Sequence, residues 1–243
     1  MKQLIILAIF LAFTQKGLFR SCGETVEYSA VRVAQVHDGA PMNPVVAFFH
    51  KSDLALKGNV KRAGDDHFNK EGYLTESSHD TYLHTANYIK LTTGDVEYTY
   101  YKNEQGQIEK MTYNGSDDVE YFTYYKSGLL AGSHGVENGI PYRTTYTYDD
   151  LGRVTTWHYT YGDDPISKDT YHYETLEDNT LKITIESTNN PQPQVYTYKD
   201  GIMRSSSLYG ETTHYSYIFD KHGNWTKQSV ENGGVTKRVV TYY

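Results

Sequence analysis

Aromatic and polar side chains alternate along much of this chain. Tyr or Phe recurs at every second position and is separated mostly by Thr, Ser, His or Ile in five stretches, at 98–100, 146–148, 171–173, 196–198 and 215–219. Side chains of a strand point alternately to its two faces. The pattern therefore predicts strands with one aromatic face and one mostly polar face, as is typical of antiparallel sheets covered on one side.

The alternating stretches repeat at a nearly constant spacing. The aromatic residue that ends each stretch recurs in steps of 24, 24, 25, 25, 21 and 24 residues, at Tyr100, Tyr124, Tyr148, Tyr173, Tyr198, Phe219 and Tyr243. A unit of about 24 residues accommodates two strands of roughly eight residues and two turns of roughly four. The period thus predicts one β-hairpin per unit.

Turn residues follow the aromatic position in each unit. Asp149 and Asp220 are suited to accept a hydrogen bond from the backbone two residues later, and glycine supplies the positive φ of a tight loop. We therefore assign structural turn roles to Gly72, Gly106, Gly128, Asp149, Gly152, Gly201, Asp220 and Gly223. The opposite hairpin ends carry Asn-Gly pairs at 114–115, 138–139 and 232–233, which favour hairpins.

These patterns predict an all-β protein: an antiparallel meander of about seven hairpin repeats of roughly 24 residues. About fourteen strands are too many for a flat open sheet, so we expect a curled or partly closed sheet, and a half-pipe, a barrel and a sandwich remain alternatives. The repeat domain is expected over 57–243, after a linker over 22–56. The unit at 178–193 lacks the turn glycine, which Glu177, Asp178 and Asn179 replace.

The N-terminus predicts export. An apolar run of ten residues, Leu4 to Phe13, is shorter than the roughly 20 residues that span a bilayer and is typical of a signal peptide over 1–21. Cys22, the single cysteine, stands in LFRSC, which resembles a lipoprotein cleavage site. Lipidation of Cys22 at the outer membrane or cell surface is the expectation. Simple cleavage, giving a periplasmic or secreted chain with a free thiol, is the alternative.

Composition and charge narrow the function classes. The 243 residues include 25 Tyr but only 8 Phe and 2 Trp, a balance that favours sheet over helix. The formal net charge is −7 and the sequence contains no basic cluster, which argues against nucleic-acid binding. One cysteine excludes an intramolecular disulfide.

The stretches YTYDDLGRVTTWHYTYG (146–162), HYSYIFDKHGNWTKQ (214–228) and KRVVTYY (237–243) resemble the YD repeat of the RHS/YD-repeat family. The resemblance extends over residues 57–243 and is most specific at 146–153 and 217–225. It implies a long ribbon of hairpins that curls, and in large members closes around a toxin domain. This chain has far fewer repeats, and is similar to the short exported YD-like proteins of Bacteroides-type bacteria.

Candidate chemistry is sparse. His79 and His84 are five residues apart, which on a regular strand puts them on opposite faces about 16 Å apart, so they do not predict a shared metal ion. Acidic residues at 149, 150, 163 and 164 occupy turn positions that already favour Asp. No nucleophile elbow or phosphate loop occurs. We therefore expect no enzyme activity, no metal and no cofactor.

Two tryptophans that follow turns, Trp157 and Trp225, are the candidate binding residues, either stacking on a sugar or anchoring a partner; covering the sheet end is the structural alternative. We expect a non-enzymatic binding or scaffold module at the bacterial envelope that recognises a carbohydrate or an envelope protein. The alternative is a wall component of an RHS-type toxin-delivery shell, whose partner would be another YD-repeat chain. Contact with the membrane would be through the lipid anchor only.

Overall fold

A computed structural model describes residues 46, 49–54 and 56–243. Over these residues the chain forms one short 3-10 helix, η1 (Lys51–Leu54), and nineteen strands. The strands are β1 (Val60–Ala63), β2 (Asp66–Phe68), β3 (Leu74–Ser77), β4 (Asp80–His84), β5 (Tyr88–Thr93), β6 (Val96–Lys102), β7 (Ile108–Tyr113), β8 (Val119–Tyr124), β9 (Leu130–Glu137), β10 (Ile140–Tyr148), β11 (Val154–Tyr161), β12 (Asp164–Thr175), β13 (Leu181–Ser187), β14 (Asn190–Lys199), β15 (Ile202–Leu208), β16 (Glu211–Phe219), β17 (Trp225–Val230), β18 (Val235–Lys237) and β19 (Val240–Tyr242).

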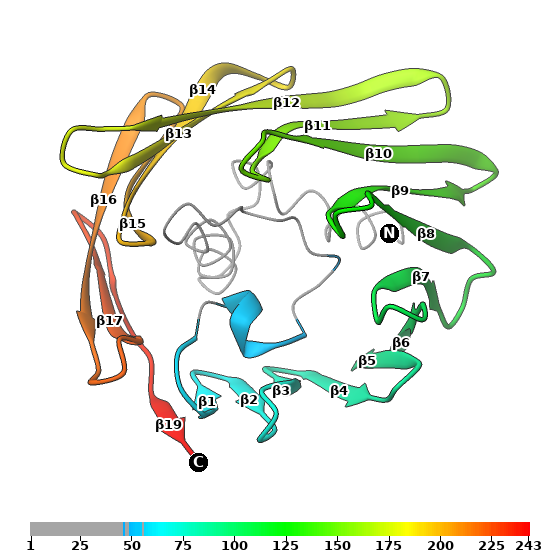
Figure 1. Cartoon of the computed structure of the whole chain (residues 1–243), viewed down its shortest axis with the longest axis horizontal. Helices are drawn as coiled ribbons and strands as arrows, with labels where there is room; N and C mark the ends of the chain where they lie inside the picture. Colours follow the sequence, from blue (N-terminus) through cyan, green and yellow to red (C-terminus); the bar gives the residue numbers. More distant parts are fainter. Residues whose placement is uncertain (1–45, 47–48, 55) are drawn as a thin grey trace.

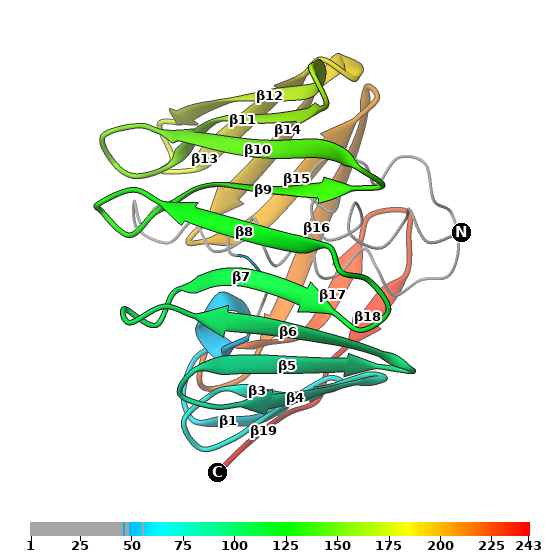
Figure 2. The ribbon, with the colours of Figure 1, turned by 90° about the vertical axis from the view of Figure 1, so that its right-hand side faces the viewer.

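Each strand from β1 to β17 pairs antiparallel with the next one in sequence. The strands are stacked side by side in chain order (Figure 2). Successive turns of such a meander lie at opposite ends of the strands. The turns that follow the even-numbered strands therefore share one edge, which we call the glycine rim because most of them contain a positive-φ glycine.

The meander curls into a ring, so that its first and last strands meet (Figure 1). β1 pairs with β2 on one side and with β19 on the other. The last segment changes partner along its length: β18 pairs with β17, and β19 pairs with β1. Within residues 56–243 the pairing of β18 is with β17 and that of β19 is with β1, so the sheet is curled round without a continuous closing ladder.

In several units an aromatic residue has the same place in the register. Phe68, Tyr124, Tyr148 and Phe219 each end a strand, and each pairs with the first residue of the next strand after a register shift. Five residues separate the two members of each pair, for example Tyr148 and Val154. In these four units an aromatic residue is thus the last pair before a five-residue turn, whereas Tyr100 and Tyr173 lie two residues, and Tyr198 one residue, before the end of their strands.

The inner face of the sheet forms the core. Its largest cluster combines buried aromatic and aliphatic side chains from β5 to β15 with Phe49, and a second cluster joins Leu54 and Leu56 to the first three strands. The buried members include Tyr98, Tyr100, Tyr146, Trp157, Tyr171, Ile183 and Tyr198. Tyrosine rings thereby supply much of the apolar area that stabilises the fold.

The predicted fold class, an all-β antiparallel meander of hairpins, is confirmed. The expected number of about fourteen strands is wrong, because the five strands between 60 and 93 have only three to six residues each instead of roughly eight. The packed domain also begins before residue 57. Phe49, Leu54 and Leu56, which the sequence placed in the linker, are buried in the core.

Candidate functional site

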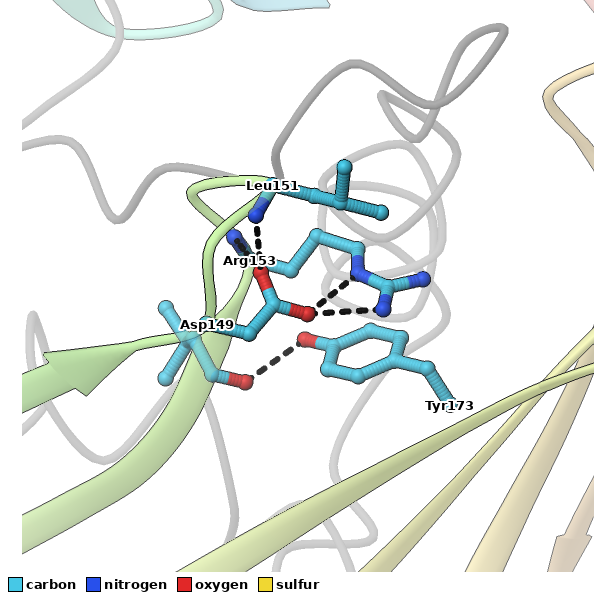
Figure 3. Close-up of polar contacts among 5 residues, drawn as sticks. Asp149, Leu151, Arg153 and Tyr173 are labelled. Atoms are coloured by element: carbon cyan, nitrogen blue, oxygen red, sulfur yellow. Dashed lines mark hydrogen bonds and ion pairs between the residues drawn. The ribbon is translucent and has the colours of Figure 1, made fainter.

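The turn between β10 and β11 shows what the acidic repeat residue does. The Asp149 N–H donates to the Arg153 carbonyl and the Gly152 N–H donates to the Asp149 carbonyl, both at 2.9 Å. Asp149 Oδ1 accepts hydrogen bonds from the N–H groups of Leu151 at 3.0 Å and Arg153 at 2.8 Å (Figure 3). Gly152 has a φ of 73°, a conformation that glycine adopts readily. The Asp149 side chain therefore organises the loop.

Arg153 completes this turn. Its Nε and one terminal guanidinium nitrogen both lie 2.7 Å from Asp149 Oδ2. The guanidinium lies 4.4 Å from the centre of the Tyr173 ring, and the Tyr173 hydroxyl donates to the Val154 carbonyl (Figure 3). Desolvation raises the pKa of Asp149, but the hydrogen bonds and charge of Arg153 outweigh it, so the pKa lies below its usual value. Both carboxylate oxygens are held by the turn.

The same turn recurs along the glycine rim. Side-chain oxygens of Asn69, Asn103 and Asp220 accept backbone hydrogen bonds from residues two or four positions later. The fourth position of each loop has a positive φ, at Gly72, Gly106, Gly128 and Gly223. In the degenerate unit Asn179, with a φ of 62°, replaces glycine, and the shorter β14–β15 loop uses Asp200 and Gly201. The turn residues identified in the sequence thus shape one edge of the sheet.

Tyrosine hydroxyls link successive hairpins beneath these turns. Tyr124 donates to the Ile108 carbonyl at 2.7 Å, Tyr148 to the Leu130 carbonyl at 2.7 Å, and Tyr173 to the Val154 carbonyl at 2.8 Å. Each acceptor is the residue two positions after a turn glycine. The hydrogen bond therefore joins equivalent positions of neighbouring repeats. This contact gives a physical reason for tyrosine, rather than phenylalanine, at the repeating position.

The two tryptophans lie in different environments. Trp157 is only 4 % exposed and stacks on Tyr159 with 6.4 Å between ring centres. Trp157 therefore does not offer the exposed ring that a binding residue needs, because its position in β11 faces the core. Trp225 is half-buried. The guanidinium of Arg238 lies 3.8 Å from its ring centre and Tyr217 contacts it edge-on. One face of the Trp225 ring is covered by the chain itself.

The two histidines His79 and His84 do not form a shared site. His79 lies in the exposed turn between β3 and β4, and His84 Nε2 lies 2.6 Å from the Leu74 carbonyl. Burial lowers the pKa of His84, which favours the neutral ring. Over residues 56–243 and the short segment before them, no group of three or more His, Cys, Asp or Glu side chains is placed to hold a metal ion.

A hollow of about 800 Å³ opens on the outer face of β8, β9 and β10. Its volume lies within the range of small-molecule sites. Tyr121, His134 and Arg143 line it and stand directly opposite one another on these three strands, because Tyr121 pairs with His134 and His134 pairs with Arg143. All three are exposed, whereas their sequence neighbours Glu120 and Tyr142 are buried on the inner face.

Aromatic and charged groups meet in this hollow. The rings of Tyr121 and His134 are stacked with 5.5 Å between their centres and an interplanar angle of 22°, and Tyr121 is 45 % exposed. Asp117 and Asp118 form the wall nearest the β7–β8 turn. The Ser116 hydroxyl, 2.8 Å from Asp118 Oδ2, orients that carboxylate. No sequence motif marks this site, and the only local signal is that the exposed residues Tyr121, His134 and Arg143 alternate with the buried residues Glu120, Ser133 and Tyr142 along β8 to β10.

Two carboxyl groups are buried on the inner face. Glu120 lies directly behind the hollow, and burial raises its pKa to about 7, against an opposing hydrogen bond from Ser133. Asp169 on β12 is fully buried, and its pKa is raised to about 6 by burial, although the Ser187 side chain acts to lower it. Both groups favour the protonated form far more than an exposed carboxyl does.

The predicted signal peptide, the lipidation candidate Cys22 and most of the expected linker lie outside the described residues. In the part of the chain that the structure describes, no helix has the length and apolarity needed to cross a bilayer.

No protein-family model and no curated protein matches this sequence. Among solved structures, a porin-like protein from Bacteroides uniformis is 15 % identical, with a TM-score of 0.42 over 73 % of this chain and 87 % of that one. A porin-like protein from Bacteroides vulgatus is 10 % identical, with a TM-score of 0.35 over 76 % of this chain and 98 % of that one. These values are too low to bear on function.

Proposed function

We propose that this chain is a non-enzymatic binding module of the bacterial envelope, exported by its N-terminal leader and anchored through Cys22. Its ligand, a glycan or the surface of another envelope protein, binds the outer face of the sheet in the hollow over β8 to β10. The observation that carries this proposal is the exposed Tyr121–His134 stack inside a concave site with Asp118 and Arg143 on its walls. Flat aromatic rings beside a few polar groups are typical of ligand sites.

The contacts of the turn residues and of the repeating tyrosines support a structural role for the repeats. The acidic turn residues are used by their own loops, and the repeating tyrosines join hairpin to hairpin. A rigid scaffold of this kind positions the hollow without having to change shape. Binding on rigid strands costs less conformational entropy than binding on loops that must become ordered.

The alternative role, a wall component of an RHS-type shell, depends on free strand edges that would pair with another chain. β1 is paired on both sides, with β2 and with β19. The first strand of the array therefore offers no free edge, and the alternative has no specific support among the described residues.

The test is a glycan array and a panel of envelope extracts probed with the full chain, followed by titration calorimetry of any hit. We expect saturable binding that falls at least about tenfold in Tyr121→Ala, since the variant removes the exposed aromatic surface. Tyr209→Ala, an exposed tyrosine on the β15–β16 turn, is the matched control. If both variants bound the ligand equally well, the hollow would not be the binding site.

A further inference from the structure

Arg143 is an exposed side chain that lines the hollow. It stands between His134 on β9 and Thr160 on β11 and lines the hollow with both of them. Within residues 56–243 its guanidinium forms no ion pair or hydrogen bond, whereas Arg62, Arg153 and Arg238 all bond to protein oxygens. An unpaired guanidinium presents five donors in a fixed plane, which suits a carboxylate or another oxyanion.

The stacked rings of Tyr121 and His134 indicate what kind of ligand would carry that oxyanion. Tyr121 and Arg143 are two strand spacings apart, about 10 Å, with His134 between them. A ligand whose negative group pairs with Arg143 can extend across His134 to Tyr121. A free inorganic anion would leave these two rings uncovered, whereas a sugar ring can pack its C–H groups against them.

The acidic wall limits the ligand further. Asp118, oriented by Ser116, and Asp117 lie at the β7–β8 side of the hollow, and neither forms an ion pair with Arg143. Carboxylates at that end accept hydrogen bonds from hydroxyl groups and repel a second negative charge. The hollow is thus suited to a ligand with one acidic end and one end rich in hydroxyls.

We infer that the hollow over β8 to β10 binds a sugar residue that carries a carboxylate. Arg143 pairs with that carboxylate, the Tyr121–His134 stack packs against the sugar ring, and Asp118 accepts hydrogen bonds from its hydroxyls. This inference rests on the proposed binding function and names the ligand class of the same site.

The test measures binding of trigalacturonic acid, its methyl ester and neutral galactotriose to the full chain by titration calorimetry. We expect the acid to bind, and its affinity to fall at least about tenfold on esterification and in Arg143→Gln, because each change removes a charge-assisted contact. Lys168→Gln removes an exposed outer-face charge on β12 outside the hollow, and its affinity should stay within about twofold. Thermal melting would verify that both variants are folded.

The outcomes separate the two proposals. If neutral and acidic sugars bind equally and Tyr121→Ala alone weakens them, the carboxylate assignment fails while the binding function stands. If inorganic phosphate competes at the same concentration as the acid, the site is a general anion site and the sugar assignment fails. If neither these sugars nor any array glycan or envelope extract binds, both proposals fail.

Discussion

The side-chain amide of Asn224 pairs with the backbone of Lys57, although 167 residues separate them. Asn224 Oδ1 accepts from the Lys57 N–H and Asn224 Nδ2 donates to the Lys57 carbonyl, both at 2.8 Å. Asn224 Nδ2 also donates to the hydroxyl of Tyr242, which in turn donates to the Asp220 carboxylate. The last glycine-rim turn, the first residues of the repeat domain and the C-terminal strand therefore meet at one point, where the two ends of the meander join.

We expect Asn224→Ala to lower the free energy of unfolding by about 2–3 kcal/mol, because it removes three hydrogen bonds from a side chain that is 3 % exposed. Urea unfolding would measure the loss, and hydrogen exchange should show faster exchange at the amides of Lys57 and β19. Asn87→Ala, an exposed asparagine in the β4–β5 turn, is the control. A loss below about 0.5 kcal/mol would contradict the role of Asn224 in joining the ends.

Removal of the Tyr148 hydroxyl tests the contact between repeats. Tyr148→Phe keeps the ring and loses the hydrogen bond to Leu130, so we expect a loss of about 1 kcal/mol. Tyr124→Phe and Tyr173→Phe should behave alike, because their hydroxyls make equivalent bonds. Tyr209→Phe, at an exposed turn, should change stability little. Equal stability of all four variants would show that the rings alone hold the repeats together.

Gly132 on β9 lies against the backbone of the next strand. A Cβ atom at this position would lie 2.1 Å from the Thr144 carbonyl oxygen, which cannot move without shifting β10. We expect Gly132→Ala to cost about 2 kcal/mol or more in chemical unfolding. Gly234→Ala is the matched control, since an added Cβ there meets nothing within 4 Å and φ is not positive. Similar stability of the two variants would contradict the close approach of β9 and β10.

Burial of Glu120 makes stability depend on pH. In the unfolded chain its carboxyl ionises near pH 4.3, whereas in the folded chain its pKa is raised to about 7. The folded state therefore binds the proton more tightly than the unfolded state does. The resulting contribution of Glu120 to the free energy of unfolding is complete below about pH 4 and is lost as the pH rises to about 7. The loss for this group is at most about 4 kcal/mol, because one pKa unit corresponds to about 1.4 kcal/mol.

Urea unfolding at pH 5 and pH 7.5 would measure this dependence. Glu120→Gln should be less sensitive to pH over this range than the natural chain, and Asp169→Asn should remove a smaller part of the slope, since the pKa of Asp169 is raised only to about 6. Glu104→Gln, at an exposed turn, should leave the slope unchanged. An unchanged slope in Glu120→Gln would contradict the effect of burial.

Local sequence signals are sufficient to predict the hairpins, because the residues that form each strand and turn lie within one repeat. The alternation around Tyr146 and Tyr148 assigns these rings to the inner face, and the glycine at 152 marks the loop that Asp149 organises. The short strands β1 to β5 were underestimated because they lack this regular period. The burial of Trp157 does not follow from its place after a turn, because that place does not specify which face of β11 the side chain occupies.

The sequence by itself determined the fold class, the repeat and the turn chemistry, since alternation and turn propensity act over a few neighbouring residues. Only the tertiary structure decided where the meander's ends meet, which side chains stand beside one another on its outer face, and which carboxyls are buried. Those features depend on strand register and on the curl of the sheet. Tyr121, His134 and Arg143 come together because three strands align, and Lys57 meets Asn224 because the whole ring brings them together.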